Sequence, residues 1–93
     1  MTISKEEQLC GEGDQAEALL QTDAFNATVN SLVEQTFQSF CNSKLEDTEA
    51  RERSFHHYRA LVDIVHTLQQ RVSIRDEIIA KTQTDDINQS EEE

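Results

Sequence analysis

The sequence predicts an all-α fold: an antiparallel two-helix hairpin with flexible acidic ends, which associates into an oligomer. Three observations favour this class. The 93 residues contain no proline and only two glycines, and 8 basic against 19 acidic residues give a net charge of −11. Apolar residues recur at spacings of three and four, which places them on one face of a helix. A chain of this length forms one small domain rather than two.

Two helices separated by a short break are expected to form the hairpin. The first is predicted over residues 24–41, with Asp23 as its N-cap, because a carboxylate there can accept hydrogen bonds from the first free amides. The second is predicted over about 47–82. Ser43 and Glu46 have the spacing of a capping box before this second helix.

The segments outside the hairpin are polar. Residues 1–14 are expected to form a flexible leader, and residues 83–93 an acidic disordered tail with no basic residue. The hairpin domain therefore spans 15–82. A short extra helix over about 15–21 is the open alternative on its N-terminal side, and it would give a self-sufficient monomer if it packed as a third helix.

The predicted core and interface residues form one apolar stripe on each helix. Phe37 and Phe40 either pack against the aromatic residues of the second helix or anchor a partner protein. Arg75 interrupts the heptad-like stripe of the second helix, so that stripe is short. The predicted residues are Phe25, Val29, Leu32, Phe37, Phe40, Phe55, Tyr58, Leu61, Val65, Leu68, Val72 and Ile79.

A hairpin of this size buries too little apolar surface to be stable without a further staple. No disulfide pattern is visible, because Cys10 and Cys41 lie in different settings and are expected to be free thiols. We therefore expect the chain to associate with itself, with another protein, or with both.

Enzyme activity is not expected. The sequence contains no GxGxxG, P-loop, GxSxG or HExxH pattern. The pairs Asp63–His66 and Glu52–His56 have ligand spacing but lack the further ligands of a metal site, so neither a metal nor another cofactor is predicted.

The charge and hydropathy patterns also restrict the partners. A net charge of −11 disfavours direct binding to nucleic acid. No stretch approaches the roughly 18 consecutive apolar residues of a membrane span, and the first residues do not form a signal peptide. A cytoplasmic protein without membrane contact is the expectation.

Several short motifs carry a resemblance over about residues 16–80. They are Ala18-Leu19-Leu20, Asp23-Ala24-Phe25, Asp47-Thr48-Glu49-Ala50-Arg51-Glu52 and Ala60-Leu61-Val62-Asp63-Ile64. In this layout the chain resembles small acidic helical proteins of tailed bacteriophages, which are often encoded near head-morphogenesis genes. The resemblance implies a viral, non-enzymatic protein made in the bacterial host cytoplasm, and it leaves association with the virion open.

Two functions from different classes follow. The first is a phage structural or assembly accessory that acts through helix–helix contacts with other protein. The alternative is an acidic inhibitor that mimics the charge of nucleic acid and binds a host or defence protein.

Overall fold

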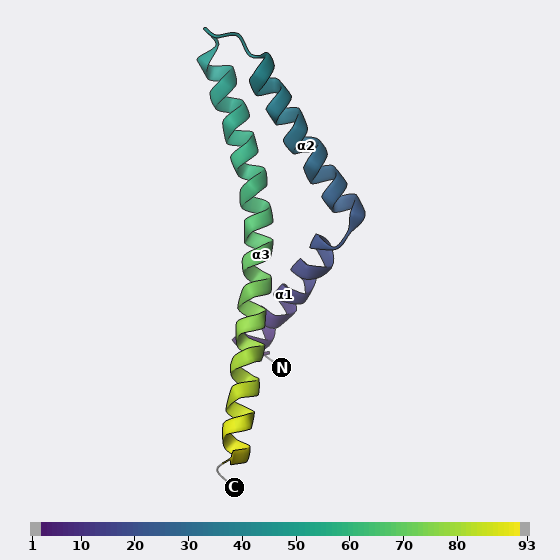
Figure 1. The fold of residues 1–93 in the computed structure, drawn as a ribbon, viewed down its shortest axis with the longest axis vertical. Helices are drawn as coiled ribbons and strands as arrows, with labels where there is room; N and C mark the ends of the chain where they lie inside the picture. The colour runs from purple at the N-terminus through teal and green to yellow at the C-terminus, as the bar shows by residue number, and fades with distance from the viewer. Residues whose placement is uncertain (1–2, 92–93) are drawn as a thin grey trace. The chain divides into compact units, whose positions relative to one another are not determined.

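A computed structural model describes residues 3–91, with side chains described over residues 3–84, and shows three α-helices (Figure 1). Helix α1 spans Lys5–Leu20, α2 spans Asp23–Asn42 and α3 spans Thr48–Glu91. The described part of the chain contains no strand, so the predicted all-helical class is confirmed. A further helix precedes α2, where the sequence left open a short extra helix over about 15–21.

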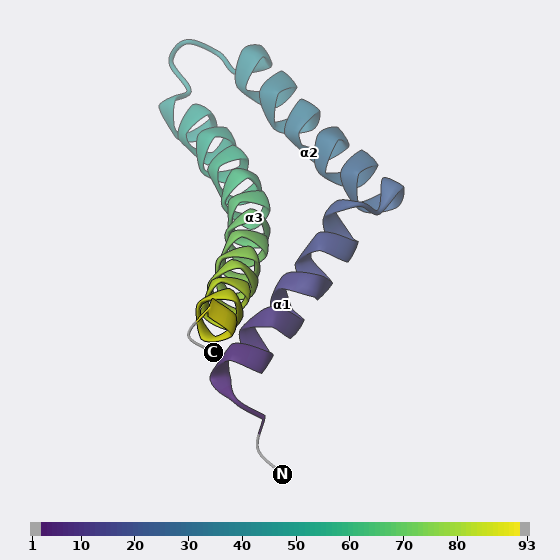
Figure 2. The same ribbon diagram turned by 60° about the horizontal axis from the view of Figure 1, so that its bottom comes forward.

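The chain divides into two compact units, and α3 contributes to both. The α1 unit consists of residues 1–19 and 68–93, and the α2 unit consists of residues 20–67. In the α2 unit, α2 runs back alongside the first turns of α3, and Figures 1 and 2 agree on this arrangement. Each unit is described separately below.

Helix α1 begins far earlier than the short helix predicted over 15–21. Ser4 caps it: the Ser4 hydroxyl accepts a hydrogen bond from the Glu7 amide at 3.1 Å, and the Ser4 carbonyl accepts one from the Gln8 amide at 3.0 Å. A serine followed three residues later by a glutamate is the start signal of a capping box. Residues 5–14, expected to be a flexible leader, are therefore helical in the structure.

The backbones of α1 and α3 approach each other closely at Gly13. A Cβ atom placed on Gly13 would lie 2.5 Å from the Cβ atom of Arg75 and 2.8 Å from the carbonyl oxygen of Arg71. Gly13 and Ala16, which lie on the same face of α1, are buried. Small side chains therefore permit the α1–α3 contact.

Arg75 adds ion pairs to the contact between α1 and α3. Its side chain is 11% exposed, and Nη1 lies 2.9 Å from Asp14 Oδ1 and 2.6 Å from Glu17 Oε2. Nη2 lies 2.9 Å from Asp76 Oδ1 on α3. Hydrogen bonds to Glu17, then Asp76 and Asp14, raise the pKa of Arg75 above its ordinary value. The residue that interrupts the apolar stripe thus holds α3 to α1 through ion pairs.

The helix caps in the link between α2 and α3 differ from the predicted capping box of Ser43 and Glu46. Ser43 instead ends α2, and its hydroxyl donates a hydrogen bond to the carbonyl of Phe40 at 2.6 Å. Asp47 caps α3, because its Oδ1 accepts a hydrogen bond from the Ala50 amide at 3.1 Å. Asp47 fills this role because it directly precedes the first helical residue.

The start of α2 also differs slightly from the prediction. Thr22 is the N-cap residue, with an extended backbone at φ −79° and ψ 121°, and Asp23 is the first residue of the helix. A carboxylate in the first turn still interacts favourably with the helix dipole. The Asn26 side chain donates a hydrogen bond to the Leu20 carbonyl at 2.8 Å, which satisfies one terminal carbonyl of α1.

Burial of the predicted stripe is incomplete. Among residues 3–84 only Gly13, Ala16 and Ser54 are buried. Six of the predicted residues are partly buried: Phe25, Val29, Leu61, Val65, Leu68 and Val72. The other six are exposed: Leu32, Phe37, Phe40, Phe55, Tyr58 and Ile79. In each unit one helix covers only one side of its neighbour, so much of the stripe stays in contact with solvent.

The C-terminal end of α3 and the cysteines complete the description. The backbone of α3 continues to Glu91, so residues 83–91 of the predicted tail are helical, whereas 92–93 lie outside the described residues. Cys10 is partly buried and Cys41 is exposed, and both are free thiols. Over the part of the chain that the structure describes, no helix combines the length and apolar character needed to cross a membrane.

The close approach at Gly13 generates a prediction with a matched control. We expect Gly13→Ala to destabilise the α1–α3 contact by about 1–3 kcal/mol, because the new methyl group meets backbone that cannot move aside. Gly11→Ala meets nothing within 4 Å and should stabilise α1 by about 0.5–1 kcal/mol through higher helix propensity. Thermal unfolding by circular dichroism, with hydrogen exchange of the α1 amides, measures both. An equal gain for the two variants would contradict the contact.

The ion pairs of Arg75 generate a second prediction. Its pKa is raised in the folded chain, so its stabilisation is present below the ordinary arginine pKa and is lost only as pH rises through the raised value. The stability difference between wild type and Arg75→Gln should therefore be constant between about pH 6 and 9. It should shrink as NaCl rises to about 1 M, because Asp14 and Glu17 are 71% and 44% exposed and are screened. If the stability difference between wild type and Arg75→Gln does not change with NaCl concentration, Arg75 acts through packing alone.

Candidate functional site

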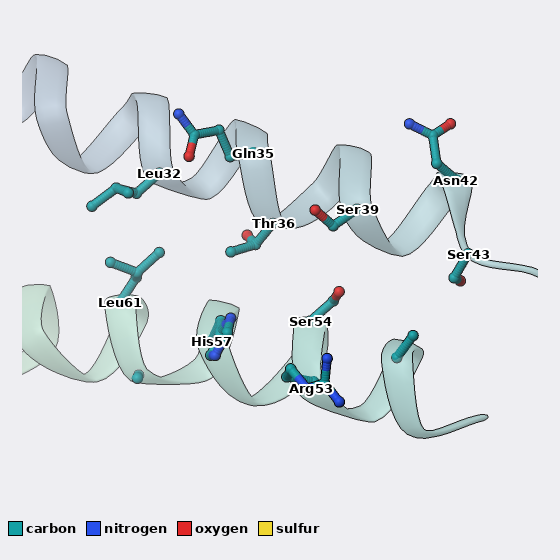
Figure 3. Close-up of a pocket in the computed structure, with 12 residues that line it drawn as sticks. Leu32, Gln35, Thr36, Ser39, Asn42, Ser43, Arg53, Ser54, His57 and Leu61 are labelled. Carbon is teal, nitrogen blue, oxygen red and sulfur yellow. The ribbon is translucent and has the colours of Figure 1, made fainter. Parts of the chain in front are cut away.

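Two grooves run along opposite sides of the α2–α3 contact in the α2 unit. The polar groove has a volume of about 680 Å³ and is lined by Leu32, Gln35, Thr36, Ser39, Asn42, Ser43, Ala50, Arg53, Ser54, His57, Ala60 and Leu61 (Figure 3). The aromatic groove has a volume of about 320 Å³ and is lined by Val33, Thr36, Phe37, Phe40, Ser54, Phe55 and Tyr58. All residues that line the two grooves belong to the α2 unit.

Helical spacing separates the two grooves. Thr36 and Ser54 line both of them, so these residues lie where the helices meet. The Thr36 hydroxyl donates a hydrogen bond to the Val33 carbonyl at 2.8 Å, which satisfies it within its own helix. Because the residues at the contact are short, the helices leave open space on either side instead of a filled core.

The polar groove has the size of a small-molecule site, which is typically about 300–1,000 Å³. Its ionisable side chains are Arg53 and His57, and Figure 3 shows the amides of Gln35 and Asn42 pointing away from α3. Across the described residues, no hydroxyl of the groove is hydrogen-bonded to His57, which is the pairing that activates a nucleophile.

Metal ligands do not gather in the α2 unit either. Within the described part of the chain, no group of three His, Cys, Asp or Glu side chains is placed to hold a metal ion. The polar groove therefore offers space and hydrogen-bonding groups.

The aromatic groove concentrates large rings on an exposed face. Phe37 is 64% exposed and Phe40 46% on α2, and Phe55 is 56% exposed and Tyr58 44% on α3. Phe55 also makes an edge-to-face contact with His56, with ring centroids 5.9 Å apart and planes at 64°. Exposed aromatic rings around a cavity are typical of the energetic centre of a protein interface.

The charges at the rims of the aromatic groove differ between the two helices. On α3, Arg51 and Arg59 lie one helical turn before and after Phe55, and the acidic Glu52 lies three residues before it. On α2, Glu34 lies one turn before Phe37, and no basic residue occurs in this helix. The α2 side of the groove therefore carries one acidic residue and no basic one, whereas the α3 side carries charges of both signs.

The two arginines differ in their own contacts. Arg51 Nη1 donates a hydrogen bond to the Lys44 carbonyl at 3.0 Å, which ties it to the link. Arg59 Nε lies 3.6 Å from Asp63 Oδ1, and both side chains are about 60% exposed. Exposed pairs of this kind contribute roughly 0–1 kcal/mol, so Arg59 can exchange its partner at low cost.

The structure brings together four predicted residues in the aromatic groove: Phe37, Phe40, Phe55 and Tyr58. They gather on an open face and do not form a closed hairpin core. Val33 and Thr36 share the predicted apolar face of α2, whereas sequence reasoning missed Ser54. For Ser54 a signal existed, because it lies seven residues before Leu61 and so continues the heptad spacing of α3.

Searches of protein-family models, curated proteins and solved structures found no match to this chain.

Proposed function

We propose that this chain is a non-enzymatic structural or assembly accessory protein that acts through helix–helix contacts with other protein, including further copies of itself. One observation carries the proposal. Among the described residues the buried ones are Gly13, Ala16 and Ser54, whereas eleven large apolar residues are at least 40% exposed. Residues that build the core of an ordinary domain are here available to a partner.

The energetics of folding support this reading. Ordering the backbone costs about 1–2 kcal/mol per residue. Removing apolar surface from water contributes about 25 cal/mol per Å², and glycine, alanine and serine supply little such surface. Although α1 packs on α3 as a third helix, the large apolar residues are at most partly buried, so the single chain lacks part of the burial that stabilises a small domain. Contact with a second protein surface supplies that part.

The resemblance to small acidic helical proteins of tailed bacteriophages supports a setting for these contacts. In that setting the protein is made in the bacterial host cytoplasm and takes part in virion assembly, with its apolar helix faces as the contact surfaces. Metals, other cofactors, nucleic acid and membranes have no part in the proposal.

The acidic inhibitor is supported by net charge and by no further feature of the fold. Two carboxylates of α1, those of Asp14 and Glu17, bind Arg75 within the same unit. Such internally paired carboxylates are poorly placed to imitate a run of phosphates.

Sedimentation equilibrium of the purified chain tests the proposal. Between about 1 and 100 µM we expect a mass that is a multiple of 10.6 kDa and a melting temperature that rises with concentration, because association stabilises the folded state. Association should persist at about 0.5 M NaCl, since apolar burial rather than charge drives it. A cooperatively melting monomer throughout this range would refute the proposal, and salt-sensitive binding of that monomer to a basic protein would favour the inhibitor.

A further inference from the structure

The geometry points to a second copy of this chain as the occupant of the aromatic groove, with the two copies related by a two-fold axis. The inference rests on the proposed function and names the surface and the partner that carry it. In this pairing each copy contributes α2 and the first part of α3, so that four helices enclose one shared apolar layer.

Self-complementarity favours a second copy over an unrelated partner. A two-fold interface uses the same patch on both copies, so the patch must offer both a projecting group and a recess. The aromatic groove offers both: the Phe37 ring is 64% exposed at its rim, and an open volume of about 320 Å³ lies between the rims. Each copy can therefore place its Phe37 ring in the groove of the other.

The exposed aromatic rings supply a large part of the area that a dimer requires. Aromatic side chains carry roughly 150–250 Å² each, so four of them that are 44–64% exposed present roughly 400 Å² per copy. The pair would then bury roughly 800 Å² of ring surface, about half of a standard interface of about 1,600 Å². The partly buried Val33 and Val62, together with the polar rims, lie next to the rings and supply further area.

The lower net charge of the α2 unit favours it over the α1 unit as the surface on which two copies meet. Residues 20–67 contain seven acidic and four basic side chains, a net charge of −3. The residues of the α1 unit contain twelve acidic and four basic side chains, a net charge of −8. Two copies therefore repel each other far less through their α2 units.

The charged rims also select one orientation of the two-fold axis. Leu32 and Leu61 face each other across the unit in Figure 3, so Glu34 and Arg59, two residues further along in opposite directions, lie at the same level. An axis parallel to the helices lays α2 of one copy over α3 of the other and brings Glu34 near Arg59 of the second copy. An axis across the helices would lay α2 over α2, where Glu34 meets no arginine because this helix contains no basic residue.

Substitution at Phe37 tests the surface. In sedimentation equilibrium Phe37→Gln should raise the dissociation constant by about 100-fold or more, because a ring at the centre of an interface carries much of its affinity. The control is Leu45→Gln, since Leu45 is 87% exposed in the link and lies outside the groove; it should leave the constant unchanged. An equal effect of the two substitutions would overturn the inference.

A charge exchange tests the partner and its orientation without removing a ring. Glu34→Arg and Arg59→Glu should each weaken association by about tenfold, and the double variant should restore it. Both side chains are exposed, so the single chain should tolerate these changes. Additive weakening in the double variant would overturn the predicted orientation.

The outcomes separate this inference from the proposed function. A wild-type chain that stays monomeric at about 100 µM would refute both this inference and the proposed function. If wild type and Phe37→Gln associate with the same dissociation constant, the aromatic groove is not the interface, and the proposed function still stands. A mass that fits more than two copies would overturn the two-fold pair in favour of a larger assembly.

Discussion

Short side chains at the helix contacts are the constraint on which this structure depends. Gly13 and Ala16 in the α1 unit and Ser54 in the α2 unit are buried, and each sits where two helices approach. Small residues allow close backbone approach, but they remove little apolar surface from water. The helices are therefore held in contact at points, and the large apolar side chains that flank these points remain available to another protein.

Arg75 shows how charge can replace apolar packing at such a contact. It occupies a position of the heptad pattern on α3, yet it reaches Asp14 and Glu17 on α1 and is nearly covered. Its always-charged guanidinium is suited to hold two carboxylates at once. The α1 unit is thus joined by ion pairs beside a glycine, whereas in the α2 unit the short Thr36 and Ser54 lie at the helix contact next to the open aromatic groove.

Helical periodicity made the helical class, the α2–α3 break and four of the groove residues predictable from the sequence. The extent of α1 was missed because Gly11 and Gly13 suggested a flexible segment, although Ser4 and Glu7 carry a capping signal. The role of Gly13 depends on a backbone sixty residues away, which local patterns cannot report. Burial was overestimated for the same reason: periodicity tells which residues share a face, but not whether a partner covers that face.

The two glycines in the middle of α1 have a consequence for the order of folding. Glycine weakens an isolated helix, so α1 gains little stability before α3 is present to receive it. The hydrogen bond from Arg75 to Asp14 joins residues 61 positions apart. On the ribosome α1 is made before α3 and must wait for Arg75 to emerge, so a nascent α1 is open to chaperones and proteases during that interval.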